Sequence, residues 1–109
     1  MLARVLAGSA LFAGLCAAGS VHAQEAGDAD KGLSYAGQAC AHCHAVRKGD
    51  AFSPHPRAPS FEAIANTAGV TGISLAAALR SSHENMPGFV LSVAEKDNVI
   101  AYILSLKRE

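Results

Sequence analysis

The sequence predicts an all-α protein with substantial loop. Apolar residues recur at helical spacing towards the C-terminus, and no segment shows the apolar–polar alternation that indicates a strand. Loops rich in proline and glycine separate the helical segments. With 109 residues, 50% hydrophobic content and a formal net charge of zero, the chain has room for one small domain.

The first 23 residues have the pattern of a secretory signal peptide. Arg4 precedes an uncharged run at 5–18, and small residues lead to a cleavage site after Ala23. The run is shorter than the roughly 20 apolar residues that a membrane span needs. We therefore expect residues 1–23 to be removed, and 24–109 to form one exported, periplasmic domain that keeps no stable membrane span.

Leu15 directly precedes Cys16, at a position where lipoprotein signals carry a small residue. Cys16 is therefore not expected to be a lipid-anchored N-terminus and would be removed with the signal peptide. The mature chain then has eight basic and nine acidic side chains, a net formal charge of −1. A net charge this close to zero creates no large positive electrostatic field that would attract a nucleic acid. Cys40 and Cys43 are the cysteines that remain.

Two elements are expected in the first half of the mature chain. Residues 30–38 favour a short helix that leads into the cysteines, although Gly32 and Gly37 weaken it. The stretch that follows His44, "AVRKGDAFSPHPRAPS", contains three prolines and a Gly-Asp pair. Such a composition predicts a loop.

Two short helices follow this loop. "SFEAIAN" has Ser60 as a potential N-cap, and "TGISLAAALRSS" places Leu75 and Leu79 four residues apart on one face. Pro87 and Gly88 then interrupt helical structure.

The C-terminal helix has the clearest pattern in the sequence. Ser92 and Glu95 match the S-x-x-E capping box, in which each side chain accepts a hydrogen bond from a free amide at the helix start. Apolar residues then follow with helical spacing: Val99, Ile100, Ile103 and Leu106. We expect a helix over 93–106.

The motif "CAHCH" at 40–44 holds two thiols and two imidazoles, and three kinds of site compete to explain it. A thioredoxin-like redox pair requires a sheet that this chain does not predict. A structural zinc site needs four ligands, and the later histidines, His55 and His83, are not spaced as in a zinc finger.

A c-type haem accounts for every residue of the motif. Thiols three positions apart can each add to a vinyl group of one porphyrin, and a histidine directly after the second cysteine can donate a ring nitrogen to the iron. We therefore predict covalent haem c on Cys40 and Cys43, with His44 as the proximal metal ligand. His42 is interpreted as a solvated spacer.

Three residues are candidates for the sixth ligand of the iron: His55, His83 and Met86. Met86 lies in "ENMPGF" between two predicted helices, and Pro87 restrains the backbone beside it. A thioether opposite histidine favours reduced iron, which suits a redox carrier. Met86 is therefore the predicted distal ligand, and the two histidines are interpreted as solvated loop residues.

The sequence resembles the small class I c-type cytochromes over residues 27–107. The matching features are the "CAHCH" motif near the start, the segment "APSFEAIA", Met86-Pro87 and the C-terminal "VIAYILSLK". The resemblance implies three to four helices wrapped around one covalently bound haem.

The resemblance also implies two contacts. The carbonyl of Pro59 would accept a hydrogen bond from the second ring nitrogen of His44, and Gly32 would let the first helix cross the last near Val99 and Tyr102. Two positions depart from the family pattern. They are Ala58, where glycine is usual, and Ala36, where an aromatic residue is usual.

These features together predict a monomeric periplasmic one-electron carrier that exchanges electrons with redox protein partners and is not an enzyme. If His44 and Met86 fill both axial positions, no substrate reaches the iron, and the haem supplies the redox chemistry. One alternative is a site whose sixth position opens to bind a small molecule. Another is a haem subunit of a larger redox enzyme.

Overall fold

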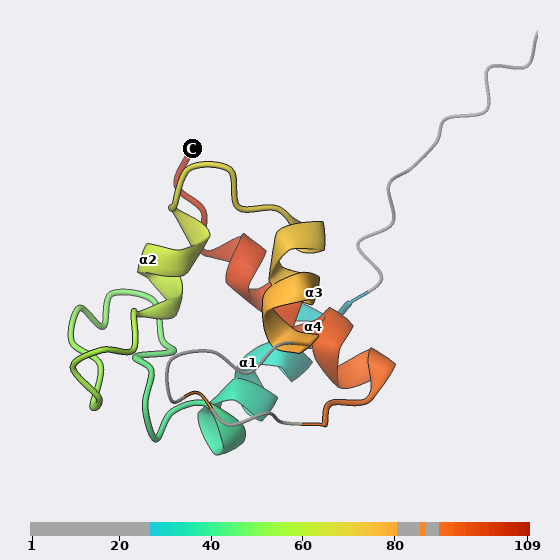
Figure 1. Ribbon diagram of the computed structural model, residues 1–109, viewed down its shortest axis with the longest axis horizontal. Helices are drawn as coiled ribbons and strands as arrows, with labels where there is room; N and C mark the ends of the chain where they lie inside the picture. Colours follow the sequence, from blue (N-terminus) through green and yellow to red (C-terminus); the bar gives the residue numbers. More distant parts are fainter. Residues whose placement is uncertain (1–26, 81–85, 87–89) are drawn as a thin grey trace, which may run out of the picture.

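The computed structural model describes residues 27–80, 86 and 90–109. Within these residues the secondary structure is helical, without strands, and follows the order α1 (Ala29–Ala39), α2 (Phe61–Ala65), α3 (Gly72–Arg80) and α4 (Val93–Ser105) (Figure 1). The predicted all-α class is confirmed. None of the described helices is both long and apolar enough to cross a membrane.

The first and last helices pack against each other, and Gly32 makes their close approach possible. A Cβ atom at Gly32 would lie 2.0 Å from the carbonyl oxygen of Asn98 and 2.8 Å from the Cβ of Tyr102. Asp28 caps α1, and its amide donates to the Asn98 side chain at 2.8 Å. The helix crossing that the resemblance implied at Gly32 is confirmed.

The predicted helix caps are present. The Ser60 hydroxyl accepts a hydrogen bond from the amide of Ala63 at 3.1 Å. At the start of α4, the Ser92 hydroxyl accepts from the Glu95 amide at 3.2 Å, and the Glu95 carboxylate accepts from the Ser92 amide at 2.8 Å. The helix ends agree with the sequence to within a few residues. The helix break at Pro87-Gly88 lies outside the described residues.

A small core joins all four helices. Ala36, where the resemblance implies an aromatic residue, is completely buried, and the neighbouring Tyr35 is half-buried and packs against the core. The buried core residues are Ala36, Val46, Phe61, Ala65, Leu75, Val99, Tyr102, Ile103 and Leu106. Because Val46 follows the "CAHCH" motif by two residues, the motif lies at the edge of this core.

Candidate haem site

The "CAHCH" motif forms a turn directly after α1. Cys40 is the C-cap of the helix, and its amide donates to the carbonyl of Ala36 at 2.9 Å. The amides of Cys43 and His44 both donate to the Cys40 carbonyl, at 3.2 and 2.9 Å. The turn therefore brings both cysteines and His44 together. The spacer His42 is exposed, as expected.

Both cysteines are free and half-buried. Burial raises the pKa of the Cys40 thiol above its ordinary value, because desolvation disfavours the charged thiolate. Metal ligation by cysteine requires the thiolate, whereas a thioether is neutral and apolar. The position of Cys40 against the core therefore suits a thioether better than a zinc–thiolate bond. In the described part of the chain, no group of three histidine, cysteine or acidic side chains is placed to hold a metal ion.

The imidazole of His44 has one nitrogen committed to the backbone. Its Nδ1 lies 2.6 Å from the carbonyl oxygen of Pro59. A carbonyl oxygen can only accept a hydrogen bond, so Nδ1 carries a proton, and in the neutral imidazole Nε2 then keeps its lone pair. The contact implied by the resemblance is thereby confirmed, and Nε2 has the electronic form that a metal ligand needs.

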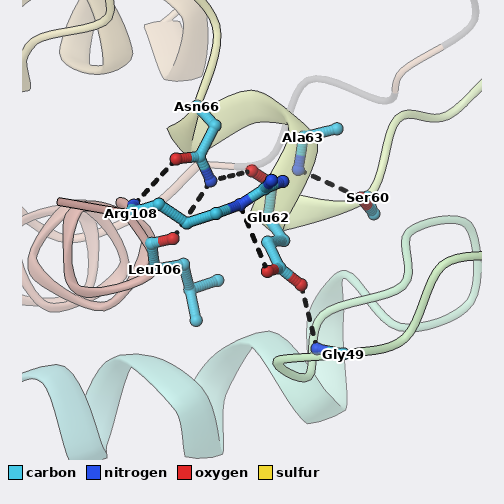
Figure 2. Close-up of polar contacts among 7 residues, drawn as sticks. All are labelled: Gly49, Ser60, Glu62, Ala63, Asn66, Leu106 and Arg108. Carbon is cyan, nitrogen blue, oxygen red and sulfur yellow. Dashed lines mark hydrogen bonds and ion pairs between the residues drawn. The ribbon is translucent and has the colours of Figure 1, made fainter.

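Hydrogen bonds from α2 to the segment after His44 hold the Pro59 carbonyl in place. The amide of Phe61, two residues after Pro59, donates to the carbonyl of Ala45 at 2.9 Å. The Glu62 carboxylate accepts from the amide of Gly49 at 2.9 Å (Figure 2). These two hydrogen bonds hold the Pro59 carbonyl at a fixed position relative to the backbone that carries the His44 imidazole.

The C-terminus supports α2 from its other end. The Asn66 side-chain amide donates to the carbonyl of Leu106 at 3.1 Å, and its Oδ1 accepts from the backbone amide of Arg108 at 2.8 Å. The Arg108 guanidinium also lies 3.8 Å from the Glu62 carboxylate (Figure 2). Because these residues are about 40 positions apart in the sequence, the network joins the middle of the chain to its end.

His55 belongs to the loop beside the second cysteine. Its amide donates to the carbonyl of Cys43 at 3.1 Å, and its Nδ1 accepts from the amide of Arg57 at 3.2 Å. The nearby Ser53 hydroxyl accepts from the Ala45 amide at 2.9 Å. The imidazole of His55 is exposed, in agreement with its interpretation as a solvated loop residue.

Met86 lies between α3 and α4, is half-buried and has no regular secondary structure. His83, the other candidate in this segment, lies outside the described residues. The structure thus joins Cys40, Cys43 and His44 on one turn, and it describes Met86 in the connection that precedes α4.

Two aromatic residues, of which Phe61 contacts His44 and Tyr102 contacts Phe61, were not assigned to the site from the sequence. The ring centroid of Phe61 lies 5.5 Å from that of His44 and 6.3 Å from that of Tyr102. The Tyr102 hydroxyl donates to the carbonyl of Val46. Phe61 follows a capping serine and Tyr102 lies on an apolar helix face, so each pattern indicates only a core residue. The contacts of Phe61 with His44 and with Tyr102 depend on the tertiary fold.

Comparison with known proteins identifies the family of the chain. Residues 29–107 match the family model for cytochrome c. Cytochrome c-552 of Bradyrhizobium diazoefficiens is 37% identical over 93 residues, which cover 85% of this chain and 88% of that protein. No solved structure shows significant similarity to the chain. The chain belongs to the cytochrome c family. It is therefore a haem-based electron carrier with covalently attached haem c.

Proposed function

We propose that this protein is a periplasmic one-electron carrier, with haem attached through Cys40 and Cys43 and iron ligated by His44 and Met86. One observation carries the proposal. The turn after α1 groups both thiols with an imidazole whose Nδ1 is bound to the Pro59 carbonyl, which leaves Nε2 for the iron. The half-buried thiols and this histidine tautomer fit the donor set of a c-type haem.

Each residue of the site has a defined task in this proposal. The bound haem supplies one-electron exchange between iron(III) and iron(II). Pro59 fixes the orientation of the His44 ring and raises its basicity by accepting the Nδ1 proton in a hydrogen bond. The thioether of Met86 is a weaker donor that favours the reduced iron. If His44 and Met86 both ligate the iron, the protein would transfer electrons and would not bind a substrate at the metal.

The cellular setting is part of the same proposal. We infer that residues 1–23 direct export and are then removed, because a basic residue, an uncharged run and small residues precede the site after Ala23. The remaining 24–109 would act as a monomer that exchanges electrons with other redox proteins. An N-terminal sequence of the purified mature protein that starts at Gln24 would agree with this processing.

The Met86→Leu variant tests the ligand assignment. Leucine has similar volume, so the substitution should cost less than about 1.5 kcal/mol of stability. Because leucine has no lone pair for iron, the variant should have a lower reduction potential and lose the weak far-red absorption band of iron–methionine ligation. It should also bind exogenous ligands such as cyanide more readily.

The control for this experiment is His83→Ala. If methionine is the native ligand, the potential and the spectrum of this variant should equal those of the wild-type protein. Should His83→Ala change both properties while Met86→Leu changes neither, the site has two histidine ligands and the proposed ligation is incorrect.

A further inference from the structure

Three aromatic rings follow one another from the proximal side of the site into the core. His44 and Phe61 have ring centroids 5.5 Å apart with an interplanar angle of 54°, and Phe61 and Tyr102 are 6.3 Å apart at 49°. We call these three side chains the aromatic row. Because the tilted arrangement is favourable for aromatic pairs, each ring restricts the orientation of the next.

The aromatic row is fastened to the backbone segment that carries His44. The Phe61 amide donates to the carbonyl of Ala45 at 2.9 Å, and the Tyr102 hydroxyl donates to the carbonyl of Val46. Phe61 is 4% exposed and Tyr102 is 6% exposed. Close packing and these two attachments leave the Phe61 ring little freedom to move away from the imidazole.

A single hydrogen bond does not fully fix a ring. The imidazole is attached through Cβ and can rotate about the Cβ–Cγ bond, and the contact between Nδ1 of His44 and the Pro59 oxygen opposes this rotation at one atom only. A second contact, from a ring that is itself immobile, removes this freedom. Phe61 makes such a contact in this structure.

We propose that Phe61 is a positioning residue, which holds the imidazole plane of His44 so that its Nδ1–H stays aimed at the Pro59 carbonyl. This inference rests on the proposed role of His44 as the proximal ligand. A well-aligned Nδ1–H···O bond raises the basicity of the imidazole, and a more basic ligand favours iron(III). Phe61 therefore helps to keep the reduction potential lower than an unrestrained histidine would set it.

The test compares two substitutions at this position in the mature haem-loaded protein. Phe61→Leu keeps an apolar side chain but removes the flat ring, whereas Phe61→Tyr keeps the ring. We expect Phe61→Leu to raise the reduction potential by an amount equivalent to a twofold to tenfold change in the one-electron equilibrium constant, or up to about 59 mV. The paramagnetically shifted proton resonances of the His44 ring should move as well. In Phe61→Tyr, both properties should stay near the wild-type values.

Val99→Ala is the control for a general loss of packing. Val99 is completely buried in the same core, on α4 beside the contact between Gly32 and Asn98. This truncation should lower the unfolding temperature and leave the His44 resonances in place. If Phe61→Leu shifts neither the potential nor the His44 resonances beyond the change seen in Val99→Ala, Phe61 is only a packing residue and the inference is wrong.

The wild-type spectrum separates this inference from the proposed function. If His44 ring protons are absent from the paramagnetically shifted region of the wild-type protein, His44 does not ligate the iron. The proposed ligation then fails, and the inference fails with it. If they are present and respond to Phe61→Leu but not to Val99→Ala, both are supported.

Discussion

At Gly32, the absence of a side chain allows α1 and α4 to pack closely together, and a single added methyl group would prevent this contact. The atoms nearest to an added Cβ belong mainly to the backbone of Asn98, which cannot rotate away as a flexible side chain could. By contrast, an added Cβ at Gly37, five residues further along α1, meets nothing within 4 Å. The same substitution at these two glycines should therefore have opposite effects.

Gly32→Ala should destabilise the protein by about 1–3 kcal/mol or more, because the helices must separate to admit the methyl group. Gly37→Ala should stabilise it by about 0.5–1 kcal/mol through higher helix propensity. Chemical denaturation of the two haem-loaded variants measures both values. Equal effects at the two positions would show that the close approach of α1 and α4 does not limit stability.

Tyr102 gives the protein a pH dependence at the alkaline end. Burial raises the pKa of its hydroxyl above the ordinary value for tyrosine, while the charge of Arg47 opposes this effect and that of Asp50 adds to it. The folded protein therefore keeps the proton to a higher pH than the unfolded chain does. As a result, the contribution of Tyr102 is complete below about pH 10, and the free energy of unfolding falls as pH rises beyond it.

Tyr102→Phe should reduce this alkaline loss of stability. Unfolding by denaturant at a series of pH values between about 8 and 11 compares the slopes of the two proteins. Part of the slope should persist in the variant, because burial also raises the pKa of Tyr35. Identical slopes in the wild type and the variant would mean that Tyr102 does not remain protonated longer in the folded state.

Sequence reasoning was most successful where a residue's role depends on its near neighbours. The spacing of Cys40, Cys43 and His44 specifies a turn that brings them together, and the structure has that turn. Phe61 could not be assigned to the site in this way, because its contact with His44 joins residues 17 positions apart through a fold that no local pattern encodes.

At the scale of elements, α2 is the helix whose stability depends most on contacts with other parts of the chain. It has five residues, which is too short for independent helical stability. Asn66, its C-cap, connects it to the carbonyl of Leu106 and the amide of Arg108. Since α2 directly follows Pro59, this support also maintains the carbonyl that binds His44.

Asn66→Ala should cost about 1–2 kcal/mol, because two hydrogen bonds to the C-terminal segment are lost. Arg108→Ala should cost less than about 0.5 kcal/mol. Its guanidinium is largely exposed in a 3.8 Å ion pair, and the bond to Asn66 comes from the backbone amide, which alanine retains. Thermal or denaturant unfolding of both variants gives the comparison. A larger effect from Arg108→Ala would show that the ion pair, not the amide bridge, secures α2.

The helices themselves were predictable because their signals are local. Ser60 and the pair Ser92 and Glu95 act within one turn, so the sequence shows the helix starts directly. The link from α2 to the C-terminus was not predictable from the sequence, since an asparagine such as Asn66 at the end of a short helix can form hydrogen bonds with many different groups. The same limit applies to Met86, whose position opposite His44 stays a prediction from the sequence.

At the scale of the whole molecule, the polypeptide has few large side chains with which to fill its own core. Aromatic residues make up 6% of the sequence and there is no tryptophan. The buried apolar side chains of the described residues include two aromatic ones, those of Phe61 and Tyr102, and the others are alanine, valine, leucine or isoleucine. The covalent haem is therefore expected to supply a major part of the apolar interior, and its attachment should be coupled to folding.

A variant with Cys40→Ala and Cys43→Ala should consequently be largely unfolded when it is purified without haem. Circular dichroism during heating should show low helicity and no cooperative transition. A sharp transition with native-like helicity would demonstrate that the protein core is sufficient alone, contrary to the role that we assign to the haem.

The central claim is that Cys40 and Cys43 hold the haem, and mass spectrometry of a tryptic digest tests it most directly. Cleavage after Lys31 and Arg47 releases peptide 32–47, which contains the whole "CAHCH" motif. In a digest of the haem-loaded protein, this peptide should carry the mass of one haem after denaturation and removal of free haem. Recovery of peptide 32–47 at its unmodified mass, from protein that was fully haem-loaded before digestion, would contradict the account.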